Sequence, residues 1–169
     1  MNNLILSNTI RFIGLVLLQV LILNHIDLFG YINPIAYIIW IFLFPIRKNK
    51  SLLLIASFLL GLSIDFFSDS GGINAAATLF IAFIRLPILK AILRKSDFDY
   101  VQFKIRTISL DKIFIYITTL TIIHHFIVFS LEYFSFNDFT TIISNTFFTS
   151  IFTILISIFG ILLFVKKNN

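Results

Sequence analysis

Two long apolar runs meet in the polar turn GLSIDFFSDSGGINA, which occupies residues 61–75. The first run closes around Asp65, and Asp69 and two adjacent glycines precede the second run. Apolar runs of roughly 20 residues are long enough to cross a bilayer as helices. We therefore predict a hairpin of two transmembrane helices, near 51–68 and 72–92, joined by an acidic turn.

The composition requires a lipid environment for the rest of the chain as well. Of its 169 residues, 59% are hydrophobic and 12% are charged, whereas soluble domains carry about 25% charged residues. So few charged residues leave too little polar surface to cover a hydrophobic core in water. A transmembrane β-barrel would need short strands that alternate apolar and polar residues, but the runs here are apolar on both faces. The sequence therefore predicts an all-α integral membrane protein.

Six apolar runs fill the chain, so residues 1–169 are predicted to form a single transmembrane domain. The six predicted helices lie near 5–26, 32–46, 51–68, 72–92, 112–133 and 140–165. The second is the shortest, because Pro34 suits its first turn and Pro45 suits its end. A re-entrant or tilted segment is the alternative for this part of the chain.

Lysine and arginine fall on one side of this six-helix arrangement. They cluster in the connections 47–50 and 90–112 and in the C-terminal tail, while the other three connections contain acidic residues and no Lys or Arg. Cytoplasmic loops of membrane proteins collect Lys and Arg, so both termini are predicted to be cytoplasmic. The net charge of +5 then reflects membrane topology, and this placement argues against nucleic acid as a partner.

Asp65 is predicted to lie inside the membrane, about one helical turn from the outer face. An intramembrane carboxylate is by default a candidate functional residue. One interpretation is that Asp65 accepts hydrogen bonds from the free amides at the start of helix 72–92, or from Asn74, and so locks the hairpin. The alternative is that Asp65 binds a cation or lies on the pathway of a transported one.

Small residues recur at helical spacing and predict close contacts between helices. In the hairpin, Ser57 and Gly61 are four residues apart, as are Gly72 and Ala76. Helix 140–165 carries a small and weakly polar stripe, which consists of Thr146, Ser150, Thr153, Ser157 and Gly160. We expect this stripe to pack against another helix, either in the same chain or in a partner subunit.

Arginine side chains near helix ends usually reach the lipid headgroups. Arg85 of helix 72–92 is predicted to lie toward the cytoplasmic face and to extend there. Its expected partners are lipid phosphates or the acids of the neighbouring connection, Asp97, Asp99 and Asp111.

Two adjacent histidines occur in helix 112–133. The side chains of His124 and His125 point about 100° apart on a helix, so they cannot chelate one ion together, and no metal site is predicted. The residues that share a face with His125 are Thr118, Thr121, Val128 and Glu132. This pattern is typical of an interhelical hydrogen-bonding seam.

Motifs of soluble enzymes are absent from the sequence. We find no Walker loop, no G-x-S-x-G, no H-E-x-x-H and no paired carboxylates in a basic cleft, and the chain contains no Cys. We expect no catalytic activity and no cofactor. The stretch 98–106 predicts a short strand or a segment on the membrane surface, where it would meet anionic lipid or a cytosolic partner.

In length and helix layout the chain resembles MreD, the small integral membrane protein of the bacterial cell-elongation machinery. The most specific match to the family pattern lies in the hairpin, at Gly61, Leu62, Asp65, Gly72, Asn74 and Ala75. Shorter matches are Leu17-Leu18-Gln19, Asn33-Pro34 at the start of the second predicted helix and Phe44-Pro45 at its end.

The resemblance implies a non-catalytic scaffold subunit of the bacterial inner membrane that helps to control cell shape and lateral peptidoglycan synthesis. The partners it implies are MreC, MreB, RodA with its transpeptidase partner, and membrane lipid. MreC projects to the outer side, and the subunit would help to couple MreB filaments inside to the wall-synthesis enzymes.

MreD-like proteins are also similar in fold to the six-helix substrate-binding subunits of energy-coupling-factor vitamin transporters, which are the alternative. Those subunits typically carry an Ala-x-x-x-Ala face on the first helix for docking the coupling subunit. Helix 5–26 contains no Ala, and the outer connections are short, which leaves little material for a lid over a vitamin. The sequence therefore favours the scaffold, since likeness of fold alone is weak evidence of function.

Overall fold

The computed structural model describes residues 2–28, 30, 32–46, 49–94, 108–134 and 139–164. The helices in these residues are α1 (Asn2–Leu21), α2 (Ile39–Leu43), α3 (Ser51–Ser68), α4 (Ile73–Leu93), α5 (Leu110–Tyr133) and α6 (Phe139–Phe164), and a short 3₁₀ turn, η1 (Leu23–His25), follows α1. The prediction of an all-α protein is thus confirmed for the described residues. The predicted surface stretch 98–106 lies outside them, as do Asp97 and Asp99.

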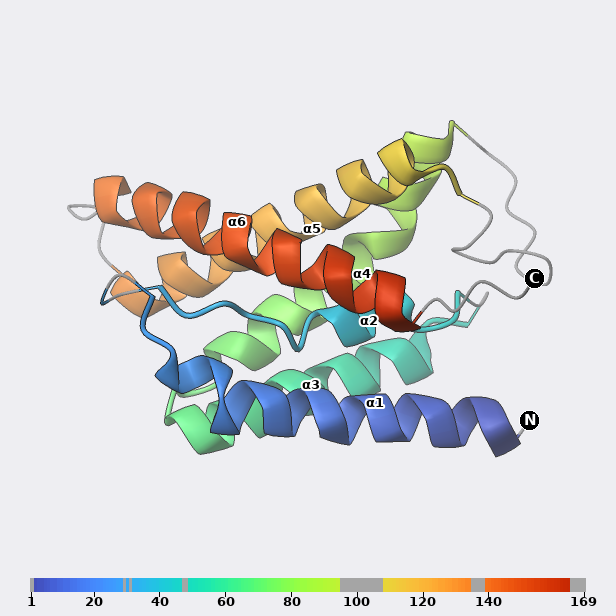
Figure 1. The fold of residues 1–169 in the computed structure, drawn as a ribbon, viewed down its shortest axis with the longest axis horizontal. Helices are drawn as coiled ribbons and strands as arrows, with labels where there is room; N and C mark the ends of the chain where they lie inside the picture. The colour runs from blue at the N-terminus through green and yellow to red at the C-terminus, as the bar shows by residue number, and fades with distance from the viewer. Residues whose placement is uncertain are drawn as a thin grey trace.

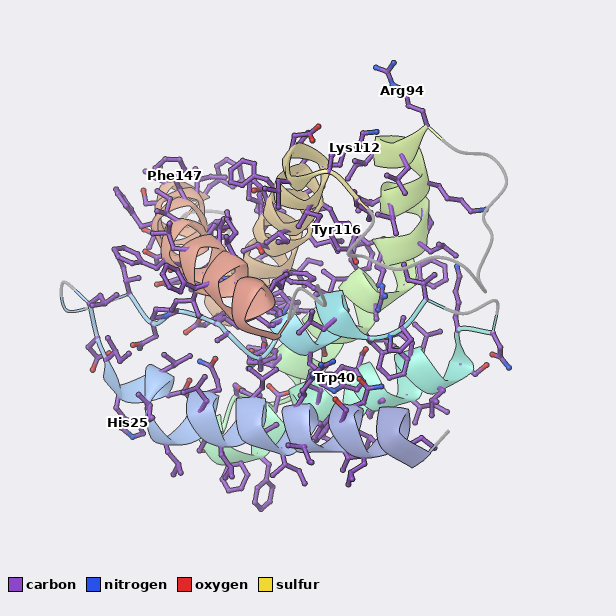
Figure 2. All side chains as sticks on the ribbon, turned by 45° about the vertical axis from the view of Figure 1, so that its right-hand side comes forward. His25, Trp40, Arg94, Lys112, Tyr116 and Phe147 are labelled. Carbon is purple, nitrogen blue, oxygen red and sulfur yellow. The ribbon has the colours of Figure 1, made fainter. Side chains whose placement is uncertain are left out.

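Five of these helices are long and apolar enough to cross a membrane. The candidate spans are Ile5–His25, Ser51–Ser68, Ile73–Leu93, Leu110–Tyr133 and Phe139–Ile161. Large apolar side chains cover their outward faces, and Phe147 of α6, which is 60% exposed, projects from the bundle (Figure 2). Extensive apolar surface of this kind marks contact with lipid or with another protein. Five helices of the described residues are therefore consistent with a multi-pass membrane protein.

The long helices run along the longest axis of the molecule (Figure 1). α3 packs against α4, α4 against α5 and α5 against α6, while α1 lies along α3. α1 begins and α6 ends at the same end of the molecule, where α4 also ends and α5 begins (Figure 1). Arg94 and Lys112 mark this basic end, and His25 marks the opposite end (Figure 2).

The prediction of a helix over 32–46 is wrong in extent, because only Ile39–Leu43 is α-helical in this part of the chain. Phe44 is already extended, with ψ 135°. Pro45 explains the end of α2, because the residue before a proline favours extended backbone. Pro34 does not open a first helical turn, since α2 begins only at Ile39.

The segment 32–46 nevertheless runs from the His25 end to the basic end, between α1 and α6 (Figure 1). Extended backbone advances about 3.3 Å per residue against 1.5 Å in a helix, so a short and partly extended segment covers this distance. The middle of the segment is the centre of the core, where Ala36, Ile38, Ile41 and Phe42 are 0% exposed. Non-helical backbone at membrane depth is tolerated only where protein buries it, as it is here.

Candidate functional site

The carboxylate of Asp65 caps the start of α4 from its position near the end of α3. One oxygen, Oδ1, accepts hydrogen bonds from the Asn74 N–H at 2.9 Å and from the Ser70 hydroxyl at 2.5 Å, and Oδ2 accepts from the Ala75 N–H at 2.8 Å. The Asn74 side-chain amide donates to Oδ1 as well, at 3.0 Å. Asp65 is 4% exposed, so these donors replace water around a buried charge. The Asn74 and Ala75 amides and the Asn74 side chain are the donors expected if Asp65 locks the hairpin.

Gly61 and Gly72, two of the three glycines of the hairpin, have different structural roles. A Cβ on Gly61 would lie 2.4 Å from the Asn74 main-chain oxygen and 2.6 Å from the Ala75 Cα, so α3 and α4 touch through this residue. Gly72 has a φ of +94°, which favours glycine, and a Cβ there would meet no atom within 4 Å. Ala76 is exposed. The predicted close contact at Gly72 and Ala76 is therefore wrong, and Gly72 serves the turn.

A chain of hydrogen bonds connects this hairpin to the irregular segment and to α5. The Tyr37 hydroxyl donates to the Asn74 side-chain oxygen at 2.6 Å and lies 3.2 Å from Nε2 of His124. Because that hydroxyl already donates its proton to Asn74, Nε2 must be the donor to Tyr37. The chain His124, Tyr37, Asn74 and Asp65 thus links α5, the segment before α2, α4 and α3.

His125 makes a second link, between α5, α6 and the irregular segment. Its Nδ1 lies 2.9 Å from the Thr121 carbonyl oxygen, which can only accept, so Nδ1 is the donor. In the neutral ring Nε2 then accepts from the Thr153 hydroxyl at 3.0 Å, and the Thr153 oxygen accepts from the Ile35 N–H at 2.9 Å. Of the seam predicted around His125, the structure shows the interhelical hydrogen bond of His125 itself, while the buried Thr118 and Thr121 hydroxyls have no hydrogen-bond partner.

The small stripe of α6 faces the interior of its own chain. Ser150 is 3% exposed, and Thr153 and Ser157 are 0% exposed. A Cβ on Gly160 would lie 3.1 Å from Cδ1 of Ile39 in α2. Of the two alternatives for the stripe, the structure thus favours packing within the chain over a contact with a partner subunit.

Gln19 of α1 binds the irregular segment as a neighbouring strand would. Its side-chain oxygen accepts from the Ala36 N–H at 2.7 Å, and its side-chain nitrogen donates to the Pro34 carbonyl at 3.0 Å. The same nitrogen donates to Asn24 at 2.8 Å. Gln19 therefore satisfies two main-chain groups that lack helical partners, which a buried backbone requires.

Arg85 departs most from the sequence prediction. Its side chain is 1% exposed and does not extend to the lipid headgroups. The guanidinium donates to the main-chain oxygens of Ile41, at 2.6 Å, and of Phe44. Tyr116 of α5, which is 1% exposed, also points into the bundle (Figure 2). Arg85 thus satisfies free carbonyl groups at the end of α2, where a cation is favourable.

An open cleft lies above this network at the His25 end of the bundle. It consists of two adjoining cavities with volumes of about 720 and 240 Å³. The residues common to both are Asn24, Asn33, Ser68, Asn74, Val128 and Glu132. The smaller cavity reaches down to Gln19 and Tyr37, and the larger one is bordered by Asp69. The cleft is therefore lined by amides, hydroxyls and carboxylates.

Gln19, Tyr37 and Arg85 were not predicted as residues that hold the centre of the bundle. For Gln19 and Arg85 the sequence carried a signal, because a strongly polar residue inside an apolar run usually faces the protein interior. Tyr37 carried none, since its role depends on the fold of the segment around it. Within the described residues, no group of three His, Asp or Glu side chains is arranged to hold a metal ion.

No protein-family model, no curated protein and no solved structure matches the chain.

Proposed function

We propose that the chain is a non-catalytic scaffold subunit of the bacterial cell-elongation complex, similar to MreD. It would lie in the inner membrane with both termini in the cytoplasm, bind MreC, and link MreB to RodA and its transpeptidase partner. Its role would be to hold these proteins together during lateral peptidoglycan synthesis and so to influence cell shape.

The observation that carries this proposal is the position, in the structure, of the residues that match the MreD pattern. The three short matches all involve the irregular segment: Gln19 binds its backbone, Asn33-Pro34 begins it and Phe44-Pro45 ends it. The hairpin match adds Asp65 and Asn74, which reach the same segment through Tyr37. Gln19 and the hairpin residue Asn74 lie outside the segment but bind it, and this convergence supports the resemblance.

The lipid-facing surface also suits a scaffold. α1 is the least buried of the five candidate spans, and side chains such as Ile10 and Leu21 are 61% and 67% exposed. Exposed apolar helix faces are where transmembrane helices of partner proteins bind, through close packing in the absence of water. Many of the exposed side chains on the helices are large and apolar, so partner helices can pack against them.

Purification with partners tests the proposal. The full chain would carry a tag at residue 169, membranes would be solubilised in mild detergent, and co-purifying proteins would be identified by mass spectrometry. We expect MreC together with other elongation-machinery proteins. A tagged Gly61→Ala variant, in which the contact of α3 with α4 is blocked, serves as the matched control and should recover less MreC per tagged chain. Purification of the intact protein without MreC would contradict the proposal.

A second candidate function is favoured by the open polar cleft. Such a cleft would suit the substrate-binding membrane subunit of an energy-coupling-factor transporter, because small-molecule sites are concave and about 300–1,000 Å³ in volume. Against it, α1 contains no Ala. The same purification separates the two functions, since a transporter subunit would recover an ATPase pair and a coupling membrane subunit in place of MreC.

A further inference from the structure

The hydroxyl stripe of α6 supplies His125 with one hydrogen-bond donor and holds two others in reserve. Thr153 donates to Nε2 of His125 and accepts from the Ile35 N–H. The hydroxyls of Ser150 and Ser157, about one turn away on either side of Thr153, are buried and have no hydrogen-bond partner within the described residues. A buried hydroxyl without a partner costs free energy. An arrangement of α6 that gave one of them a partner would recover this cost.

The stripe is repetitive enough to fit α5 in a second position. Its members are four, three, four and three residues apart, so each is about one turn from the next: Thr146, Ser150, Thr153, Ser157 and Gly160. If α6 moved one turn toward the basic end, Ser150 would take the place of Thr153, and Ser157 that of Gly160. A Cβ on Gly160 lies 3.1 Å from Cδ1 of Ile39, which is the flexible end of a side chain, so a small shift of Ile39 admits Ser157.

The sequence and the chain connection favour this direction over the opposite one. A step away from the basic end would bring one of residues 161–164, which are ILLF, to the place of Gly160. Asn145 donates to the hydroxyl of Tyr133, the last residue of α5, so the six residues of α6 before Asn145 extend about 9 Å beyond α5. A step of about 5.4 Å toward the basic end shortens this overhang and does not stretch the connection.

α6 is also long enough to move without leaving the membrane. Its 26 residues extend about 39 Å, whereas the hydrocarbon core of a bilayer is about 30 Å thick. It packs chiefly against α5, with a smaller contact to α2, and lies along one side of the bundle (Figure 1). A step of α6 therefore leaves the packing of α1, α3, α4 and α5 in place.

We propose that α6 has two registers against α5. It reaches the second register by a step of one helical turn toward the basic end, with Ser150 in place of Thr153 beside His125. Steps of one turn between packed elements occur in other protein switches. This device does not depend on the scaffold proposal and requires no partner protein.

The step connects the two ends of the bundle. It separates Asn145 from Tyr133, and both residues line the smaller cavity of the cleft. The same step moves the other end of α6 outward at the basic end. A change in the cleft on one side of the membrane would thus be accompanied by a change on the other side.

Disulfide trapping in the purified full-length protein, reconstituted into liposomes, tests the proposal because the chain has no Cys of its own. Positions 132 and 146 face each other, since each is seven residues, about two turns, from the member of the His125–Thr153 bond on its own helix. The pair Glu132→Cys and Thr146→Cys therefore reports the register of the structure.

Two further cysteine pairs report the two possible steps. Glu132→Cys with Ile142→Cys reports the step toward the basic end, and Glu132→Cys with Ser150→Cys reports the step away from it. Positions 142 and 150 are each four residues from 146, so the two pairs are matched in distance. Mass spectrometry counts the thiols that remain free after oxidation. We expect the 132–142 pair to cross-link faster than the 132–150 pair, and equal rates or the reverse order would overturn the proposal.

Hydrogen-bond variants of the 132–142 pair separate a register step from local fluctuation near the turn. Ser150→Ala removes the hydroxyl that the second register uses and should lower the cross-linking rate about fivefold, the effect of one neutral hydrogen bond. Thr153→Val removes the hydroxyl of the first register and should raise the rate by a similar factor. Ser157→Ala is the matched control, because that hydroxyl meets His125 in neither register, and it should leave the rate unchanged.

The comparison of Ser150→Ala with Ser157→Ala decides the role of Ser150 even if Thr153→Val does not fold. Equal cross-linking rates in these two variants would refute that role and, with it, the second register.

Discussion

Asp65 makes four hydrogen bonds with residues of the turn and of α4, so this one side chain holds α3, the turn and α4 together. Two of the donors are main-chain N–H groups that the start of any helix leaves free. The carboxylate thus stabilises the local structure of the hairpin, and its hydrogen-bond donors offset the free-energy cost of burying it. A bound cation is not needed to explain why an acid lies at this depth.

Substitution of Asp65 tests this account by graded loss of the acceptors. Asp65→Asn keeps one acceptor oxygen but presents an amide nitrogen to the Ala75 N–H, so we expect partial destabilisation. Asp65→Ala removes all acceptors and should cost more, with each lost hydrogen bond to the charged group contributing about 1.5–3 kcal/mol. Unfolding midpoints in detergent, measured by circular dichroism during heating, provide the comparison.

The neighbouring acid is the control for these variants. Asp69 is exposed and has a φ of 50°, a conformation that Asn tolerates, so Asp69→Asn should leave the unfolding midpoint near that of the wild type. If Asp65→Asn were as damaging as Asp65→Ala, the charge itself would be essential, and the hydrogen-bonded turn would not be a sufficient explanation.

Gly61 allows a second prediction at the scale of one residue. A methyl group there would overlap the backbone of α4, since its nearest contact is the Asn74 carbonyl oxygen at 2.4 Å. Gly61→Ala should therefore force the helices apart and destabilise the protein by about 1–3 kcal/mol. Gly14→Ala is the matched control, because a methyl group on Gly14 meets nothing within 4 Å. That control should gain up to about 1 kcal/mol from its higher helix propensity. The two unfolding midpoints should move in opposite directions.

At the scale of elements, the irregular segment 32–46 depends on side chains from three helices. Gln19 of α1, Arg85 of α4 and Thr153 of α6 bind its main-chain groups. The sequence shows where apolar runs start and stop, and this was sufficient to predict the five long helices within a few residues. It could not show that side chains distant in the sequence would bind the backbone of a short apolar run and keep it non-helical. The predicted helix 32–46 was therefore too long.

The same reasoning explains the error on Arg85. From position alone an arginine near a helix end is expected at the headgroups. Its actual partners are the carbonyl oxygens at the end of α2, and these are free only because α2 is so short. The errors on helix 32–46 and on Arg85 therefore have one cause.

Gln19→Leu tests the dependence of the irregular segment on α1. The substitution keeps an apolar helix but leaves the Ala36 N–H and the Pro34 carbonyl without their side-chain partner. An unsatisfied buried group costs about 1–3 kcal/mol, so we expect destabilisation of at least this amount. Thr9→Val on the same helix is the control, because the Thr9 hydroxyl bonds within α1 and is exposed. Equal unfolding midpoints for Gln19→Leu and the wild type would show that the clamp is dispensable.

At the scale of the whole molecule, the two ends of the bundle differ in chemistry. The basic end carries Arg94 and Lys112 (Figure 2), and the polar cleft with Glu132 lies at the opposite end, where His25 lines it. The proposed orientation places the basic end in the cytoplasm, following the distribution of Lys and Arg. The sequence alone predicted this separation of charge, but the cleft could not be predicted, because its lining comes from five separate parts of the chain.

Single cysteines test the orientation without background, since the chain contains no Cys. Asp69→Cys lies at the cleft end and Asp111→Cys at the basic end, and both positions are exposed. In intact cells whose outer permeability barrier has been opened, a membrane-impermeant maleimide should label Asp69→Cys and not Asp111→Cys. Permeabilised inner membranes should allow labelling of both. The reverse pattern in intact cells would invert the proposed topology.

The irregular segment also has a consequence for how the protein enters the membrane. Its backbone cannot remain in lipid alone, because lipid offers no partners for free N–H and C=O groups. One of its partners is Thr153, which lies 118 residues after Ile35 and in α6, the last of the described helices. Residues 32–46 can therefore reach their final place only after α6 has been made. The core of the protein is then completed late in synthesis, and a chain arrested before α6 would leave the Ile35 N–H without its partner.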